Sequence, residues 1–292
     1  LALIRAKQHK AVAILGSATP SVESFYKAEQ EKFKLLELKT RPASRPMPEL
    51  HMIDLKALAL KDRYLSDELL EELRATIAKG EQAIIFLNRK GFSHYLMCQD
   101  CGEVPHCTQC SVSLTYYKSS PQLRCHYCGF SSGAPSECHK CFGRKFRYVG
   151  FGTEAIEKEI KTQLPDTKIE RLDADTATTT GKLEDILSRF RSGDIQVLIG
   201  TQMLAKGHDF PNVTFIGIVL AEMGLHIPDF RASERTFQLI SQVSGRAGRG
   251  DKPGKVFIQS YIPEHSIIQN ALNNDYRTFY QDEITIRRDF LY

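Results

Sequence analysis

All eight cysteines of the 292-residue chain fall between positions 98 and 141, where they form four CxxC pairs. A CxxC pair presents two thiolates from one tight turn, and two such pairs complete the tetrahedral shell that Zn²⁺ prefers. Disulfides are disfavoured, because the chain shows no secretory signal pattern and the cytoplasm is reducing. We therefore expect a cytoplasmic protein with a small module that binds two zinc ions. The candidate ligands are Cys98, Cys101, Cys107, Cys110, Cys125, Cys128, Cys138 and Cys141.

The order of the four pairs allows two arrangements of the two sites. The second and third pairs are separated by fourteen residues, a length that lets two turns face each other across a short hairpin. The first and fourth pairs would then close an outer site around the inner one. A sequential arrangement, in which the first pair joins the second and the third joins the fourth, stays open. Gly102 and Gly129 each follow a pair directly and suit tight turns.

The cysteine region also contains histidines and aromatic residues. The histidines are expected to be exposed or to donate hydrogen bonds around the sites, because the thiolates already fill two tetrahedra; they are His94, His106, His126 and His139. The aromatic side chains are equally suited to stacking on nucleic-acid bases and to forming the core of the module; they are Tyr116, Tyr117, Tyr127 and Phe130.

The formal net charge of +4 suggests a nucleic-acid partner only until the zinc sites are counted. Each four-cysteine zinc site carries about two negative charges once its thiols are deprotonated. Residues 82–150 contain eight Lys or Arg against three Asp or Glu, and this excess of five falls to about one after four charges are subtracted. Net charge alone therefore does not indicate DNA binding.

Apolar strands and amphipathic helices alternate outside the cysteine region. Runs typical of buried strands are 11–15, 83–87, the residues near 169, 197–199, 213–220 and 256–259. Doubly buried strands that alternate with helices indicate a parallel α/β sheet, so the cysteine module is an insertion within one α/β domain. The longest apolar run, 215–221, is far shorter than a membrane span, and no membrane partner is expected.

Capping residues give the expected ends of several helices. Ser66 and Thr153 are expected to begin helices, and Gly80 and Gly193 to end them. A further helix is expected through Phe237. Three prolines at positions 42, 46 and 48 oppose helix formation and indicate a linker before the first of these helices.

The segment SQVSGRAGR, residues 241–249, has the features of an arginine finger. It places Gln242, Arg246 and Arg249 near the end of a helix-forming stretch, beside two glycines that allow close approach. Guanidinium groups held in this way neutralise charge on a transferring phosphoryl group and contribute roughly 1000-fold to turnover. By itself the GRxGR pattern is weak evidence, because arginines beside glycines are common on protein surfaces.

The segment GTQMLAKGHDFPNV, residues 200–213, directly follows an apolar strand. It is therefore expected at the carboxyl end of that strand, where open α/β sheets bind ligands. Thr201 and Gln202 can donate to a nucleic-acid phosphate, Gly207 allows close approach, and Asp209 can hold a ribose or an arginine. Taken alone, the segment is better explained as an ordinary polar loop with a solvated Lys206.

The order of these motifs resembles the primosomal helicase family PriA, also called primosomal protein N′, within the superfamily 2 DNA helicases. The resemblance spans nearly the whole chain, and related motors that share GRxGR lack the cysteine insertion. The segments that carry it, in order, are GSATPS, NRKGF, the four CxxC pairs, GTE, RLDADT, GTQMLAKGHDFPNV, IPDFRASERTFQL and QVSGRAGRG.

The resemblance implies an α/β fold, a RecA-like parallel-sheet lobe with an inserted two-zinc module. Its expected parts are 1–38, the end of a first RecA-like lobe; 39–63, a linker; 64–94 and 149–265, the second lobe; 95–148, the zinc module; and 266–292, the start of a truncated C-terminal domain. It also implies nested zinc sites, with the first and fourth pairs forming one site and the inner pairs the other.

The resemblance further assigns roles to individual residues. Ser17 and Thr19 look like the contacts of motif III, which links the ATP state to the grip on DNA, and Thr201 and Gln202 look like DNA contacts. The expected ATP-binding residues are Gly207, Asp209, Arg246 and Arg249, and the expected catalytic residues are Gln242, Arg246 and Arg249.

The implied activity is ATP-dependent 3′ to 5′ DNA unwinding that starts primosome assembly at stalled forks. ATP and Mg²⁺ are the implied cofactors beside two Zn²⁺. The implied partners are forked or single-stranded DNA, other primosome proteins and single-strand binding protein. The sequence contains no GxxxxGK[ST] loop and no DExH box, which hold the phosphates and Mg²⁺ in such motors, so the chain alone is not expected to hydrolyse ATP. The alternative is a degenerate motor lobe that serves as a zinc-stabilised platform for DNA or proteins.

Overall fold

A parallel β-sheet is the centre of the computed structural model. The structure describes residues 2–38, 47–58, 60, 63–88, 94–110, 112–117, 120–173, 175–177, 179–204, 210–227, 229–248, 250 and 252–289. Six strands run in the order β1-β11-β10-β2-β9-β8, and every neighbouring pair is parallel. Their bounds are β1 (Glu49–Asp54), β2 (Gln82–Leu87), β8 (Ile169–Leu172), β9 (Val197–Gly200), β10 (Val213–Val219) and β11 (Lys255–Ser260).

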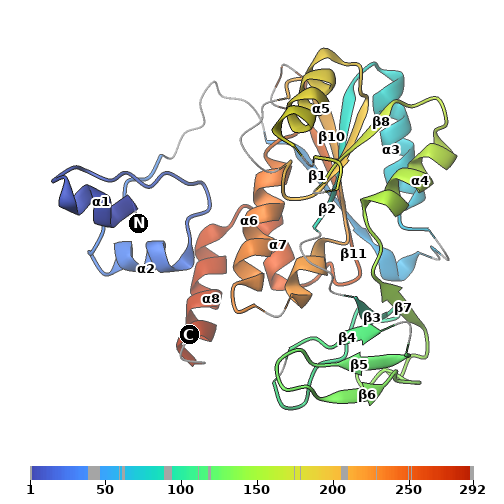
Figure 1. The fold of residues 1–292 in the computed structure, drawn as a ribbon, viewed down its shortest axis with the longest axis horizontal. Coiled ribbons are helices and arrows are strands. Elements are labelled where there is room, and N and C mark those ends of the chain that lie inside the picture. The colour runs from blue at the N-terminus through green and yellow to red at the C-terminus, as the bar shows by residue number, and fades with distance from the viewer. Residues whose placement is uncertain are drawn as a thin grey trace.

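Helices cover both faces of the sheet, which explains why β2, β9 and β10 are buried along their whole length. One hydrophobic cluster joins the sheet to α3 (Asp67–Ala78) and α4 (Thr153–Gln163). The other cluster joins it to α5 (Thr180–Ser192), α6 (Ala232–Ser244) and the C-terminal helices α7 (Ser266–Leu272) and α8 (Tyr276–Asp289). Figure 1 shows these two helical layers. The predicted parallel α/β sheet is confirmed.

Most of the helix ends follow from local capping chemistry. The Ser66 hydroxyl accepts the backbone N–H of Leu69 over 3.2 Å at the start of α3, as predicted. Gly80 and Gly193 follow α3 and α5 with φ of 72° and 87°, which favour glycine. The prediction that Thr153 caps α4 is wrong. Its hydroxyl donates to Asp173 Oδ2 over 2.6 Å, and the residue before it caps the helix without a side chain.

The cysteine module extends from the lobe between β2 and α4. Its stem pairs β3 (Tyr95–Cys98) with β7 (Phe146–Val149) in antiparallel fashion. The far end holds a three-stranded sheet of β4 (Thr115–Tyr117), β5 (Gln122–Arg124) and β6 (Ser131–Gly133). In Figure 1 this sheet lies beyond the stem, away from the lobe.

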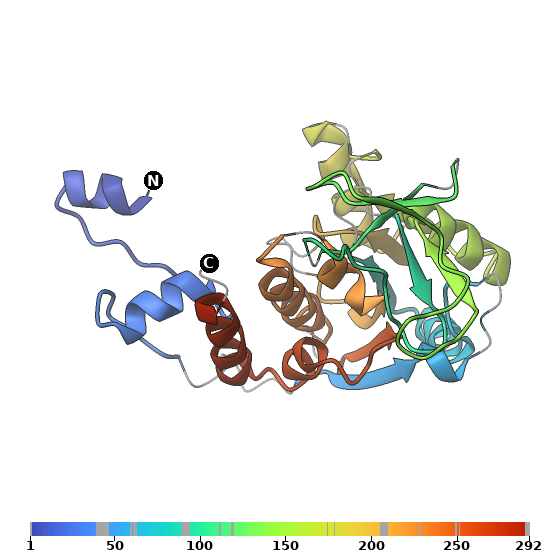
Figure 2. The same cartoon turned by 90° about the horizontal axis from the view of Figure 1, so that it is seen from below.

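The N-terminal residues differ from the sequence-based expectation. They form α1 (Ala2–Gln8) and α2 (Val22–Glu29), and α2 lies beside α8 (Figure 2). The predicted buried strand at 11–15 is wrong, because Val12 and Ile14 are 88% and 87% exposed. No described strand pairs with residues 11–15. An apolar run becomes a buried strand only where other strands lie beside it.

Two further segments belong to the lobe, although the sequence predicted a linker for one and a separate domain for the other. Residues 49–54, within the predicted linker 39–63, form the edge strand β1 beside β11, followed by a short 3-10 turn, η2 (Leu55–Ala57). Helices α7 and α8, within the predicted separate domain at 266–292, contribute Ile268 and Phe279 to the core of the lobe. None of the described helices has the length and apolar content of a membrane span.

Candidate functional site

The four CxxC pairs adopt a common backbone turn. In each, the N–H of the first cysteine donates to the carbonyl oxygen five residues later, over the same 2.8 Å. Such a turn directs both Sγ atoms to one side, as a metal site requires. The donor and acceptor residues are Cys98 and Glu103, Cys107 and Val112, Cys125 and Phe130, and Cys138 and Gly143.

In three of the four turns, the described residue that follows the second cysteine closes the turn. At Gly102 and Gly129 the φ is 76°, and at Phe142 it is 60°. The N–H of each donates to the carbonyl of the first cysteine of its turn over 2.9 to 3.1 Å. The glycines were predicted from the sequence. Phe142 was not, because a non-glycine residue with positive φ carries no sequence signal.

The turns assemble into two four-cysteine clusters, and the Sγ atoms of each lie within 4.8 Å of one another. The first turn joins the fourth in an outer cluster, and the second joins the third in an inner one. Tetrahedral zinc with Zn–S bonds of about 2.3 Å needs an S–S separation of roughly 3.8 Å. The clusters therefore fit two zinc ions. Measured Sγ–Sγ distances are 3.5 Å (Cys98–Cys141), 3.7 Å (Cys101–Cys138) and 3.6 Å (Cys107–Cys128).

Backbone amides favour the thiolate form in two of the turns. The N–H groups of Cys128 and Tyr127 point at the Cys125 thiol and lower its pKa to about 7. Burial raises the pKa of Cys138, but the N–H groups of Cys141 and Lys140 bring it below its ordinary value. Amides that stabilise a thiolate also stabilise a metal–thiolate bond.

The histidines of the module lie around the clusters and outside them, since both sets of ligand atoms are entirely cysteine. His94 pairs with the Tyr148 hydroxyl over 2.6 Å, and His126 lies 3.2 Å from the Tyr117 hydroxyl. Neither contact reaches a cysteine, and His106, His126 and His139 are exposed, which was the other expectation.

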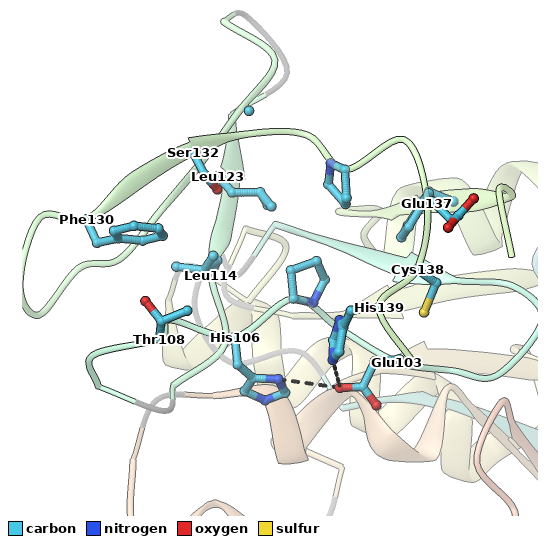
Figure 3. Close-up of a pocket in the computed structure, with 14 residues that line it drawn as sticks. Glu103, His106, Thr108, Leu114, Leu123, Phe130, Ser132, Glu137, Cys138 and His139 are labelled. Carbon is cyan, nitrogen blue, oxygen red and sulfur yellow. Dashed lines mark ion pairs between the residues drawn. The ribbon is translucent and has the colours of Figure 1, made fainter. Parts of the chain in front are cut away.

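A cavity of about 310 Å³ lies in the module, and Cys138 of the outer cluster is among the residues that line it. Leu114, Leu123 and Phe130 line its apolar part (Figure 3). At its rim the Glu103 carboxylate lies 3.7 Å from both His106 and His139 and 3.3 Å from Lys140. Because His106 and His139 belong to the turns of different clusters, Glu103 links the two.

The aromatic residues divide between the two roles that the sequence left open. Tyr116 and Phe130 pack against the core of the module, which includes Leu96 and Leu123. Tyr117 and Tyr127 are 36% and 66% exposed. Stacking of these two exposed rings on nucleic-acid bases stays a prediction.

The outer cluster adjoins the motor lobe. A Cβ atom on Gly102 would lie 2.5 Å from Ile262 Cγ2 and 3.0 Å from the Tyr261 carbonyl oxygen. On the stem, Arg147 Nη1 donates to the Tyr261 hydroxyl over 3.1 Å. The residues that follow β11 thus support the base of the module.

Four of the predicted motor residues are described on the lobe, and three others fall outside the described residues. Half-buried Thr201 and Gln202 directly follow β9, as predicted. Gln242 is exposed near the end of α6, whereas Arg246 is buried in the turn after it. The undescribed residues are Gly207, Asp209 and Arg249.

The structure brings the ends of two motor segments together. The N–H of Gly248 donates to the Val213 carbonyl over 3.0 Å, which places the turn after α6 beside the end of segment 200–213. Of the motif III residues, Ser17 is exposed and its hydroxyl accepts the N–H of Thr19 over 3.1 Å, whereas Thr19 is buried.

Sequence reasoning missed a polar group between α6, α8 and the Thr19 segment. The Gln238 amide donates to the Thr19 carbonyl over 3.1 Å, and Arg287 pairs with Glu234 over 2.7 Å. Gln238 and Glu234 lie in the segment IPDFRASERTFQL, which carried the resemblance without a role for either. Their helical spacing of four gave a signal for mutual contact, but not for their contacts with distant segments.

Comparison with known proteins gives two family matches. The model "PriA DNA helicase Cys-rich region (CRR) domain" matches residues 107–132, which contain the inner cluster. The model "Helicase conserved C-terminal domain" matches residues 140–251, which contain most of the lobe after the module.

Relatives align with almost the entire chain. Replication restart protein PriA of Bacillus subtilis is 47% identical over 100% of this chain, and that of Treponema pallidum is 41% identical over 98%. The chain spans 36% and 43% of their respective lengths. Among solved structures, yeast Dbp5 bound to RNA and ADP BeF3 has a TM-score of 0.48 at 16% identity, covering 96% of this chain and 52% of its own. That likeness adds nothing to what the relatives indicate.

Proposed function

Because the chain belongs to the PriA family of replication restart proteins, we propose that it is the part of an ATP-driven DNA helicase that carries the second RecA-like lobe. In the longer protein, the activity is 3′ to 5′ unwinding of DNA that precedes primosome assembly at stalled forks. The observation that carries this proposal is the nested double four-cysteine module inserted between β2 and α4 of a parallel helicase-type sheet.

The zinc ions act structurally in this proposal. The outer site takes the first and fourth cysteine pairs and the inner site the second and third. Four protein ligands leave no open coordination position for a substrate, as expected of a structural zinc. The small core of the module, with Leu96, Leu114 and Leu123, is too limited to order it without metal.

The motor residues act on ATP that is held mainly by groups outside these residues. When bound, ATP would supply the phosphoryl group and Mg²⁺ would supply positive charge beside it. Arg246 and Arg249 neutralise negative charge on that group, Gln242 orients it, and Gly207 and Asp209 shape the pocket. The position of Arg246 directly after α6 supports this role, because the helix fixes the direction of the turn.

DNA is the proposed polymer substrate, in forked or single-stranded form. Ser17, Thr201 and Gln202 contact its phosphates, and Thr19 holds the Ser17 segment. The exposed Ser17 and the position of Thr201 at the carboxyl end of β9 support these contacts. Other primosome proteins and single-strand binding protein are the proposed protein partners.

The test is DNA-stimulated ATP hydrolysis by the full-length protein. Arg249→Ala and Arg246→Ala are expected to lower kcat at least about 100-fold, with unchanged affinity for single-stranded DNA. Arg189→Ala is the matched control, because this exposed arginine on α5 pairs with the surface carboxylates of Glu170 and Asp185. Unchanged turnover in both finger variants would contradict the assignment.

A wild-type protein that binds DNA without hydrolysing ATP would favour the alternative function. The lobe would then be a zinc-stabilised platform for DNA or proteins. Removing zinc from that platform should abolish binding, whereas the two arginine variants should bind like wild type.

A further inference from the structure

Gln238 connects the motif III segment to helix α6. Its Nε2 atom lies 3.1 Å from the Thr19 carbonyl oxygen, 3.4 Å from that of Pro20 and 3.2 Å from Glu234 Oε1. Thr19 in turn donates its N–H to the Ser17 hydroxyl. Hydrogen bonds to the N–H and the carbonyl of Thr19 therefore link exposed Ser17, through the Thr19 backbone, to α6.

Apolar packing fixes the same segment laterally. Val22 and Phe25, on α2, are buried against the helical layer, and the Phe25 ring meets the rings of Tyr276 and Tyr280 on α8 edge-on at 5.2 and 4.6 Å. In Figure 2 one end of α2 lies beside α8. The carbonyls of Thr19 and Pro20 are thus held at the surface of α6 by the chain that follows them.

An ion-pair group fixes the helices beneath. Arg287 on α8 is only 4% exposed and lies 2.7 Å from Glu234 on α6, 2.9 Å from Glu283 on α8 and 3.4 Å from Glu23 on α2. Buried charges paired in this way tolerate little displacement, because separating them exposes each to an apolar surrounding. Glu234 is held by Arg287 on one oxygen and by Gln238 on the other.

The far end of α6 leads to the proposed ATP contacts. Gln238 and Gln242 are four residues apart, so they lie one turn apart on the same face of the helix. Arg246 follows in the turn after Ser244. A continuous α-helix transmits a shift along its axis with little distortion, so movement at Gln238 reaches Gln242 and Arg246.

We propose that Gln238 is a positioning residue that couples DNA contact at Ser17 to the placement of Gln242 and Arg246. This inference rests on the proposed function, because it assigns a structural path between the proposed DNA contact and the proposed ATP contacts. Gln238 touches neither ligand. It sets where α6 lies relative to the Thr19–Pro20 carbonyls.

The experiment uses the full-length protein with and without single-stranded DNA. Gln238→Ala removes the donor, and Gln238→Glu removes it without a change of size and adds repulsion from Glu234. In both variants the DNA-stimulated kcat is expected to fall about fivefold, the effect of losing one or two hydrogen bonds. The DNA-free rate, the KM for ATP and the half-saturating DNA concentration are expected to stay unchanged.

Gln269→Ala is the matched control, because Gln269 donates to the Pro263 carbonyl over 2.7 Å on α7, away from this path. It should keep full stimulation. Equal loss of the basal and stimulated rates, or a lowered Tm in both variants, would mean a merely structural role and would overturn the inference, as would unchanged stimulation. If the wild type shows no DNA-stimulated hydrolysis, the proposed function fails first and the inference falls with it.

Discussion

The Sγ atoms of Cys98 and Cys141 lie 3.5 Å apart although 43 positions separate them in the sequence. Cys98 ends the first strand of the stem, and Cys141 lies shortly before the strand that returns to the lobe. The outer cluster therefore ties the entry of the module to its exit. The sequential arrangement, which the spacing of the cysteines allowed, would place these two thiols in different sites.

Zinc counts in paired double variants distinguish the two arrangements. We expect wild type to hold two zinc ions, and Cys98→Ser with Cys141→Ser to keep one, because both changes fall in the outer cluster. Cys98→Ser with Cys107→Ser damages both clusters and should keep none. Metal analysis of the purified proteins measures this. Sequential sites would exchange the two results.

The glycine turns differ in what lies beside them. Gly129→Ala should destabilise the zinc-loaded protein by about 1 kcal/mol, the cost of positive φ for a residue with a Cβ atom. Gly102→Ala carries that cost and also a contact of 2.5 Å with Ile262 Cγ2. We expect it to destabilise by at least ~1 kcal/mol more. Equal shifts of the denaturation midpoint in the two variants would contradict the close approach of the outer turn to the lobe.

Phe142→Gly is expected to stabilise the outer turn. Phe142 has a φ of 60° and is 70% exposed, so the substitution relieves backbone strain and removes little buried area. Relief of the backbone strain stabilises the folded protein by about 1–2 kcal/mol. Glycine also gives the unfolded chain more conformational entropy, which offsets part of this and leaves a net stabilisation of roughly 0.5–1 kcal/mol. Thermal unfolding measures it. Phe142→Ala is the control, because alanine keeps the strained φ, and a gain there would assign the effect to the ring.

His226 gives the stability of the lobe a pH dependence. Burial lowers the pKa of His226 to about 3, and its ring packs 4.9 Å from that of Tyr95. Below the ordinary histidine pKa near 6.5, the unfolded chain binds a proton at this residue and the folded chain does not. The free energy of unfolding therefore decreases as the pH drops below that value. We expect wild type to lose about 1–2 kcal/mol more than His226→Gln between pH 7 and pH 5.

Comparing the two proteins at each pH isolates this group, because zinc release by acid affects both alike. The measurement is the denaturation free energy at matched zinc concentration. Parallel curves for wild type and variant would show that folding does not lower the pKa of His226.

Local chemistry explains which parts of the fold the sequence predicted. Ser66, Gly80 and Gly193 mark helix ends because caps depend on a few adjacent residues. The CxxC spacing likewise predicts the turns that the cysteine pairs form. Thr153 looked like a cap for the same reason, but its hydroxyl donates a hydrogen bond to Asp173, twenty residues away, and a long-range partner has no local signature.

Long-range contacts also explain the remaining differences. The apolar run at 11–15 has the composition of a buried strand, but strand formation depends on neighbours that no described residue provides. Strand β1 was not predicted, because the prolines that indicated a linker end just before it, at position 48. Gln238 seemed an ordinary polar residue of a helix, and only its contact with the Thr19 carbonyl gives it a role.

The paired strands of the stem have a consequence for how the cysteine module can evolve. Tyr95 opposes Val149 at its base, so the polypeptide leaves the lobe and returns at almost one point. An insertion attached in this way adds little closure entropy to the host, however long it grows. The lobe and the module can therefore lengthen, shrink or diverge independently, and a motor of this kind could acquire a metal-bound appendage without rebuilding its sheet.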